Sequence, residues 1–374
     1  MAGAAASARR GAGLSGIVEL PRRIAALDGA ARARAERLLD IDVITSHTDP
    51  PASMTEWLTR TFGSLDAVRE QRLVRVTNRA TLESTVLAAL RARRPIESNG
   101  DGPAGDLRGE IEASAGDPFC HPEQETPADT FGRVRGRRML SGANAAQADA
   151  HHAVLVFDDH DPLAFDADLV DDLFATGREW AERARADDPA ATHYLLMWNC
   201  LWRAGGSIIH GHAQALLGRG RPHARIDRFR RDAAAYSAAT GADLVADLAA
   251  LHRDLDLAVD AGGGVTILAH LVPVKEHEVL VVGRPGMDER DPAFARAVGR
   301  ALETLRDGVG VRSFNLALWR APLDAVGDPF PPIVHIVDRG DPAIRPSDIG
   351  AMELYGSPIV AGDPYELVAA LRAG

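Results

Sequence analysis

The sequence predicts an α+β fold of two related halves, with a mostly antiparallel sheet and an N-terminal helical extension. Apolar runs and amphipathic stretches give the order strand, strand, helix, strand, strand from Val134 to Leu217, and this order returns after Val265. Before these halves, residues 17–72 carry apolar side chains mostly at helical spacing. We therefore expect a disordered tail over 1–16, the extension over 17–72, a first half over 73–260 and a second half over 261–374.

Composition limits the classes of function. The chain has 374 residues, of which 46% are apolar, so it can bury a full hydrophobic core. Its formal net charge of −11 argues against general binding to nucleic acids or anionic membranes, whose partners are usually basic. Cys120 and Cys200 are the only cysteines, so no disulfide framework is expected. The N-terminus has no continuous apolar core typical of a signal peptide, and no apolar run approaches the ~18 residues of a membrane span. We expect a cytoplasmic protein.

The extension contains two amphipathic runs, Ile24–Leu39 and Met54–Phe62. Their helices would pack on the main body or form a subunit contact, so a homodimer is one of two alternatives left open. Further elements follow from apolar periodicity. They are a strand start at Leu73, an extended or helical stretch over Ser84–Leu90, a strand-like stretch over Thr130–Arg138, a strand over His151–Phe157, a helix from Ala167 to Ala186, a helix over Pro292–Gly308, and strands over Phe314–Trp319 and from Ile333.

The stretch from Trp198 to Gln214 carries the strongest chemical signal. An apolar run gives way to Asn199, a Gly205-Gly206-Ser207 turn follows, and His210, His212 and Gln214 then stand at alternate positions. If Ser207–Leu217 is a strand, these three side chains project from one face. A glycine turn also lets a ligand approach backbone N–H groups, so Gly206 is a binding candidate.

These residue types suit group transfer to phosphorus. A neutral imidazole can attack phosphorus and carry the transferred group covalently. A neighbouring His can orient it or hold a metal, and a Gln amide can donate to a phosphoryl oxygen. The alternative, in which the His and Gln side chains merely line a solvated sheet face, does not explain why they follow a Gly-Gly-Ser turn.

The segment Asn199…Gly205-Gly-Ser-Ile-Ile-His210-Gly-His212-Ala-Gln214 resembles the active site of the galactose-1-phosphate uridylyltransferases. These belong to the histidine-triad superfamily, which also includes ADP-glucose phosphorylases and dinucleoside-tetraphosphate phosphorylases. The resemblance implies that His212 is the nucleophile and Gln214 the phosphate donor, with Asn199 and Ser207 close by. It also implies that each half is a histidine-triad-like unit. In the second half His335 lies in the matching strand but Ile333 stands two residues earlier, so that half is expected to be non-catalytic.

Four further residues enter as substrate-binding candidates only through this resemblance. Arg91-Ala-Arg-Arg94-Pro is similar to an element whose two arginines reach the phosphates, although a solvated helix end is the alternative. Asn144 matches a position that faces the nucleoside, and Glu353 lies in a segment similar to one that touches the sugar phosphate. His152, in a strand, is interpreted as a structural or pocket residue.

A metal site is also implied. The segment from Asp117 to Cys120 resembles a family element in which two cysteines bind zinc, with Asp117 replacing the first cysteine. Since zinc accepts Asp, the residues Asp117, Cys120, His160 and His210 could form a tetrahedral site. The alternative is a degenerate site, with Cys120 packed as a small hydrophobe.

The expected function is nucleotidyl transfer through a nucleotidyl-histidine intermediate, with a nucleotide-sugar and a phosphorylated acceptor as partners. The runner-up is a phosphorylase acting on a nucleotide-sugar or a dinucleoside polyphosphate. A third reading, a catalytically inactive nucleotide-binding protein, belongs to another class.

Overall fold

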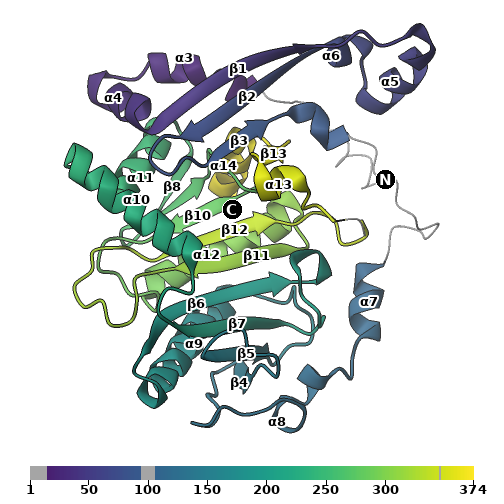
Figure 1. The fold of residues 1–374 in the computed structure, drawn as a ribbon. Coiled ribbons are helices and arrows are strands. Elements are labelled where there is room, and N and C mark those ends of the chain that lie inside the picture. The colour runs from purple at the N-terminus through teal and green to yellow at the C-terminus, as the bar shows by residue number, and fades with distance from the viewer. Residues whose placement is uncertain (1–14, 94–105, 345–346) are drawn as a thin grey trace.

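A computed structural model describes residues 15–93, 106–344 and 347–374 of the chain (Figure 1). Its centre is a nine-stranded sheet of order β4-β5-β7-β6-β11-β12-β10-β9-β8, in which every neighbouring pair is antiparallel. The strands are β4 (Met139–Ala143), β5 (His151–Phe157), β6 (Ala191–Cys200), β7 (His212–Arg219), β8 (Ala258–Gly262), β9 (Val265–Ala269), β10 (Val279–Val282), β11 (Phe314–Trp319) and β12 (Ile333–Asp338). The predicted α+β class with a mostly antiparallel sheet is confirmed.

The large sheet contains the expected internal repeat. The first unit runs β4, β5, α9 (Ala167–Asp187), β6, β7, and the second runs β9, β10, α12 (Pro292–Glu303), β11, β12. In space the strands follow the same order in both units, β4-β5-β7-β6 and β9-β10-β12-β11, and the units meet where β6 pairs with β11. The two halves therefore share one continuous sheet.

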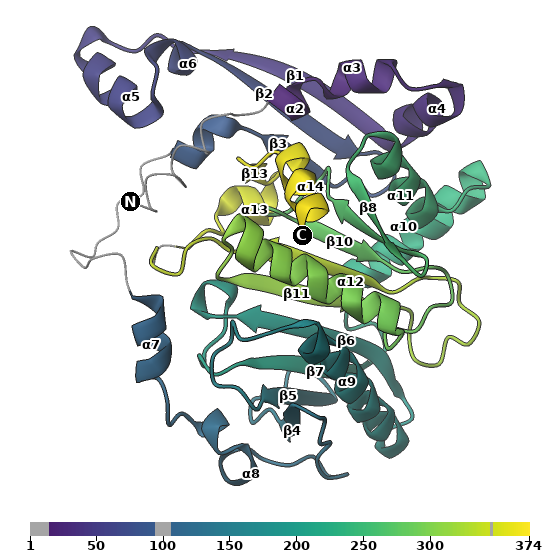
Figure 2. The ribbon, with the colours of Figure 1, turned by 180° about the vertical axis from the view of Figure 1, so that it is seen from behind.

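Helices α9 and α12 cover the same face of this sheet and pack against each other (Figure 2). Each begins at an aspartate whose carboxylate accepts a backbone N–H: Asp166 from Leu169 and Asp291 from Ala293. The helices come close at Gly299, where an added Cβ would lie 2.7 Å from the Cα of Ala167. Large apolar side chains fill the layer between helices and sheet; those that are fully buried include Trp180, Trp198, Phe174 and Phe294. This packing fixes the sheet that carries the candidate site.

The N-terminal region departs from the predicted helical extension. Residues 39–47 form β1 (Leu39–His47), which pairs antiparallel with β2 (Glu70–Asn78) along its whole length. Helical spacing ends at Leu38, and the β-branched residues that follow favour a strand. Together with β3 (Ser84–Leu87) and β13 (Ile359–Val360), these strands make a second sheet.

This second sheet joins the two ends of the chain. Strand β13 pairs parallel to β3, so a C-terminal segment completes an N-terminal sheet. The hairpin of β1 and β2 runs across one side of the molecule, and α5 and α6 lie at its far end (Figure 1). The expected boundaries at 72 and 260 each fall inside a strand, β2 and β8. Of the expected tail, residues 1–14 lie outside the described residues, and Ser15 begins helix α2.

The remaining elements connect the sheets. The α-helices are α2 (Ser15–Val18), α3 (Leu20–Ala25), α4 (Gly29–Leu38), α5 (Thr55–Phe62), α6 (Leu65–Arg69), α7 (Leu107–Ala113), α8 (Pro122–Glu125), α10 (Ala224–Thr240), α11 (Leu244–Asp254), α13 (Ala351–Tyr355) and α14 (Pro364–Ala373). The shorter turns are η2 (Ala52–Met54), η3 (Ala89–Arg93), η4 (Pro118–Cys120) and η5 (Trp202–Ala204), and the π-helical turn η6 (Thr304–Val309) ends α12.

The predicted strand over Thr130–Arg138 is wrong, since only isolated bridges form there. Among the described helices, none has the length and apolar character needed to cross a membrane.

Candidate functional site

The candidate site is built around the connection between β6 and β7. After Cys200 the chain turns through η5, and Leu201 and Gly205 both have positive φ, at 67° and 91°. The N–H of Gly206 donates to the carbonyl of Leu201 at 3.0 Å. A Cβ on Gly206 would lie 2.8 Å from the carbonyl oxygen of Asn199, so this tight return requires glycine. Ser207 is exposed on the far side of the turn.

The strand expected over Ser207–Leu217 begins later, at His212. Its pairing with β5 sets the start: His212 stands opposite Val156, and Gly211 accepts from the N–H of Phe157 at 2.9 Å. His212 and Gln214 are alternate residues of β7 and share a face, as predicted. His210 precedes the strand and points into a different cluster, so the three residues do not share one face.

His212 is held in a form suited to nucleophilic attack. Its side chain is buried, and its Nδ1–H donates to the carbonyl of His210 at 2.8 Å. The Nε2 atom then carries the lone pair. The edge of the His212 ring meets Phe119 at 4.9 Å between centroids. Burial lowers the pKa of His212, because the charged form would be desolvated, and this outweighs the opposite effect of its bond to the carbonyl of His210. His212 is therefore neutral near pH 7.

Gln214 is oriented by a residue whose role sequence reasoning left open. Its Oε1 lies 2.9 Å from the Nε2 of His152, on the neighbouring strand β5. The Nδ2 of Asn144 lies 3.3 Å from the same nitrogen. When His152 donates to Gln214, the Nε2 amide group of Gln214 faces the opposite way and can donate to a ligand. The structure thus brings the predicted residues Asn144 and Gln214 together through His152.

Asn199 is bound by a residue that sequence reasoning missed. Asn315 of β11 stands directly opposite Asn199 of β6, and its Nδ2 donates to the Oδ1 of Asn199 at 2.7 Å. Nothing in the local sequence around Asn315 signals this contact, since it depends on how the two halves pair.

The four predicted metal ligands converge. One ligand atom from each of Asp117, Cys120, His160 and His210 lies within 4.8 Å of all the others. The Sγ of Cys120 is 3.4 Å from the Nδ1 of His160 and 3.5 Å from the Nδ1 of His210. The two Nδ1 atoms are 3.1 Å apart, and the Oδ1 of Asp117 is 3.8 Å from the Nδ1 of His210. Ligands around a tetrahedral zinc ion are about 3.3–3.6 Å from each other, so this arrangement fits a metal site.

The surroundings of the two histidines support the same interpretation. The Nε2 of His210 bonds to the carbonyl of Phe157 at 2.9 Å, and the Nε2 of His160 bonds to the carbonyl of Ile111 at 3.0 Å. Each Nε2 therefore carries a proton, and the two Nδ1 lone pairs face each other. Lone pairs at this separation repel unless a cation lies between them. The Oδ2 of Asp117 is also buried without a hydrogen-bond partner among the described residues.

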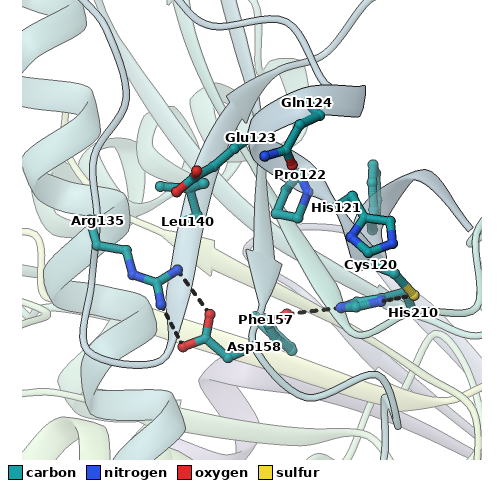
Figure 3. Close-up of a pocket in the computed structure, with 11 residues that line it drawn as sticks. Cys120, His121, Pro122, Glu123, Gln124, Arg135, Leu140, Phe157, Asp158 and His210 are labelled. Carbon is teal, nitrogen blue, oxygen red and sulfur yellow. Dashed lines mark hydrogen bonds and ion pairs between the residues drawn. The ribbon is translucent and has the colours of Figure 1, made fainter. Parts of the chain in front are cut away.

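A cavity of about 220 Å³ opens beside this cluster (Figure 3). Its wall includes Cys120 and His210 on one side and, on the other, the ion pair between Arg135 and Asp158 at 2.9 Å. His212 does not line this cavity. The cavity therefore opens beside Cys120 and His210 of the cluster, and not beside His212.

None of the described contacts places the remaining predicted residues beside His212. Arg91 is exposed in η3, and Arg94 lies outside the described residues. The Oε2 of Glu353 accepts from the N–H of Gly350 at 2.8 Å, which caps the start of α13. Their proposed contacts with substrate stay predictions.

Comparison with known proteins gives the fold a context. No family model and no curated protein matches the sequence. Among solved structures, an ADP-glucose phosphorylase from Arabidopsis thaliana with bound ADP-glucose is similar at a TM-score of 0.59 and 15% identity, covering 80% of this chain and 98% of that one. A GalT-like protein from Arabidopsis thaliana gives a TM-score of 0.56 at 16% identity, covering 69% of this chain and 92% of that one.

A uridylyltransferase is also similar, with a TM-score of 0.55 at 17% identity, over 80% of this chain and 98% of that one. The chain therefore has the fold that the ADP-glucose phosphorylase, the GalT-like protein and the uridylyltransferase share. The resemblance indicated by the sequence is confirmed for the fold. At these identities the likeness carries the architecture alone.

Proposed function

We propose that this protein is a nucleotidyltransferase that works by double displacement on nucleotide-sugars and sugar 1-phosphates. The observation that carries the proposal is the state of His212. It is buried and neutral, its Nδ1–H is committed to the carbonyl of His210, and its Nε2 lone pair is available. Gln214 on the same face can donate to a phosphoryl oxygen.

The two steps balance without an added acid. In the first, the Nε2 of His212 forms a bond to the α-phosphorus of the nucleotide-sugar, and the bond from that phosphorus to the bridging oxygen breaks. Sugar 1-phosphate leaves with the electron pair. In the second, a phosphate oxygen of the acceptor attacks the same phosphorus and releases His212. Amide donors from Gln214 and Asn199 would stabilise the charge on the non-bridging oxygens.

The metal cluster has a supporting task in this proposal. Asp117, Cys120, His160 and His210 would hold zinc through four protein ligands, which is the arrangement of a structural site without an open position. The ion would fix His210, whose carbonyl accepts from His212. Zinc held there would add rigidity to the segment that carries His212.

The acceptor separates this proposal from its runner-up. A phosphorylase would form the same nucleotidyl-His212 and pass the nucleotidyl group to inorganic phosphate, giving a nucleoside diphosphate. The similarity in fold to an ADP-glucose phosphorylase supports testing phosphate beside sugar 1-phosphates. Both reactions use the residues described above and differ in the product of the second step.

The direct test is to trap the intermediate. The protein is incubated with ADP-glucose or UDP-glucose labelled at the α-phosphorus, denatured in alkali and mapped by mass spectrometry. We expect label on His212, and no label in His212→Ala. Chasing labelled protein with glucose 1-phosphate or inorganic phosphate identifies the acceptor. Protein that binds nucleotide-sugar but never takes up label would be a nucleotide-binding protein without turnover.

A further inference from the structure

The second half, which lacks the histidine pair, reaches into the candidate site through one side chain. Asn315 donates from Nδ2 to the Oδ1 of Asn199 at 2.7 Å and to the carbonyl of Ala204 at 2.8 Å. Ala204 directly precedes the Gly205-Gly206 turn. One amide of the second half therefore bonds both to Asn199, near the end of β6, and to the residue that precedes the glycine turn.

The orientation of Asn315 is itself fixed. The Nη1 of Arg339 donates to its Oδ1 at 2.5 Å, so its amide nitrogen must face Asn199 and Ala204. Arg339 in turn makes two bonds to the carboxylate of Asp348, at 2.7 and 3.1 Å. The Nζ of Lys275 lies 3.3 Å from the same carboxylate. The positive charge of Arg339 is therefore already paired with the carboxylate of Asp348.

The electrostatics favour this arrangement. Partial burial of Asp348 by itself would raise its pKa, but the bonds from Arg339 and the nearby Lys275 bring the pKa below its usual range. Asp348 is therefore ionised at neutral pH and anchors the guanidinium. The backbone carbonyl of Arg339 also accepts from the Nε of Arg203 at 3.1 Å, a second tie between the end of β12 and the connection.

We propose that Asn315 and Arg339 are positioning residues that set the amide of Asn199 for phosphate binding. An asparagine amide has two orientations related by a half-turn. With its Oδ1 held by Asn315, Asn199 presents its Nδ2 group on the opposite side, where it donates to a phosphoryl oxygen. In the other orientation it would turn an acceptor oxygen toward an anion. The proposal rests on the proposed function, because it gives Asn199 its task at the same phosphate.

The test is a double-mutant cycle. Asn315→Ala, Asn199→Ala and the double variant are compared with the unmodified chain for the Kd of ADP and UDP and for the rate of label uptake by His212. Hydrogen bonds to charged groups correspond to about 10- to 150-fold in affinity, so we expect Asn315→Ala to weaken binding by ~10-fold or more. In the Asn199→Ala background the same change should cost less than ~2-fold, because its effect passes through Asn199.

Two further variants separate positioning from stability. Ser313→Ala removes a neighbouring bond between the halves, from the Oγ of Ser313 to the carbonyl of Cys200 at 2.7 Å, and should lower the melting temperature without changing the Kd. Asn315→Asp keeps an acceptor for Arg339 but loses the amide donor, so it should resemble Asn315→Ala in binding. This second variant decides the matter if Asn315→Ala folds poorly.

The outcomes are distinguishable. If Asn315→Ala raised the Kd equally in the unmodified chain and in the Asn199→Ala background, the positioning role would be overturned. The proposal of nucleotidyl transfer would then still stand. Full affinity in Asn315→Asp would do the same. If the unmodified chain binds ADP or UDP but His212 takes up no label, the proposed function fails, and the Kd values alone still decide the cycle. If neither nucleotide binds, both proposals fail.

Discussion

The two halves of the large sheet have the same frame and different contents. In the first, β7 carries His212 and Gln214, with an available nitrogen on one and an orientable amide on the other. In the second, the matching strand β12 carries Ile333 and His335. The Nδ1 of His335 lies 3.0 Å from the Oε1 of Glu278, and its ring stacks 4.1 Å from Trp319. The same strand thus carries the proposed nucleophile in one half and an internally paired histidine in the other.

This difference shows that the proposed chemistry depends on only a few residues of one half. The frame depends on many apolar positions that both halves keep, whereas the candidate chemistry depends on a few polar residues in one connection. The second half contributes a side chain, Asn315, to the candidate site of the first.

The largest effect should come from substituting His212, with a substitution of His335 in the second half as the matched control. His212→Ala should lower transfer by at least ~10³-fold, since it removes the nucleophile, and His212→Gly should be partly rescued by added imidazole. His335→Gln, which can keep a bond to Glu278, should leave transfer within ~2-fold. Initial rates with labelled nucleotide-sugar check both. A fully active His212→Ala protein would end the covalent proposal.

The next effect concerns metal, for which the second half offers no comparable cluster among the described residues. Purified protein should contain about one zinc per chain, and Cys120→Ala should lose it, because one thiolate is a quarter of the ligand set. Removing a structural ion also lowers stability, by several kcal/mol or more. Elemental analysis and thermal melting measure this, with Cys200→Ala as a cysteine control away from the cluster. Metal-free protein with full activity and stability would show the site to be vestigial.

A smaller effect is expected from the arginines Arg91 and Arg94, which precede β4 in the chain. Arg94→Ala should raise the KM for the phosphorylated substrate by about 10- to 150-fold, the loss of a charge-assisted bond of roughly 1.5–3 kcal/mol. Arg94→Lys should be intermediate, because it keeps the charge and loses the two-pronged geometry. The melting temperature should hardly change. If instead the kinetics are untouched and the melting temperature falls, this basic run is a structural helix end.

The smallest effect is on the acid dependence of stability. His252 of α11 is buried beside His270, and burial lowers its pKa to about 3. The unfolded chain takes up this proton near pH 6.5 and the folded chain does not, so stability falls as pH drops below ~6.5. Its share of the slope is up to ~1.4 kcal/mol per pH unit. His252→Gln should flatten the dependence of unfolding free energy on pH between about 6 and 4, measured by denaturant titration. An unchanged slope would assign the acid sensitivity to other groups.

Much of the frame could be predicted because its signals are local. Apolar periodicity identified β5, α9, β11 and β12, since alternation or helical spacing within a few residues determines which face is buried. It failed for β1, a nine-residue strand with four β-branched side chains, whose partner strand comes later in the chain. It also placed the start of β7 too early, because the first pairing depends on where β5 ends.

The sequence by itself determined the residue types of the candidate site: a histidine two residues before a glutamine, and four candidate metal ligands in separate segments. Only the tertiary structure decided their partners. His152 meets Gln214 across 62 positions, and Asn315 meets Asn199 across 116. Such contacts follow from the register of antiparallel strands and from the pairing of β6 with β11, which no local pattern encodes. The orientation of each amide, and with it the direction in which the site can donate, is therefore a property of the assembled sheet.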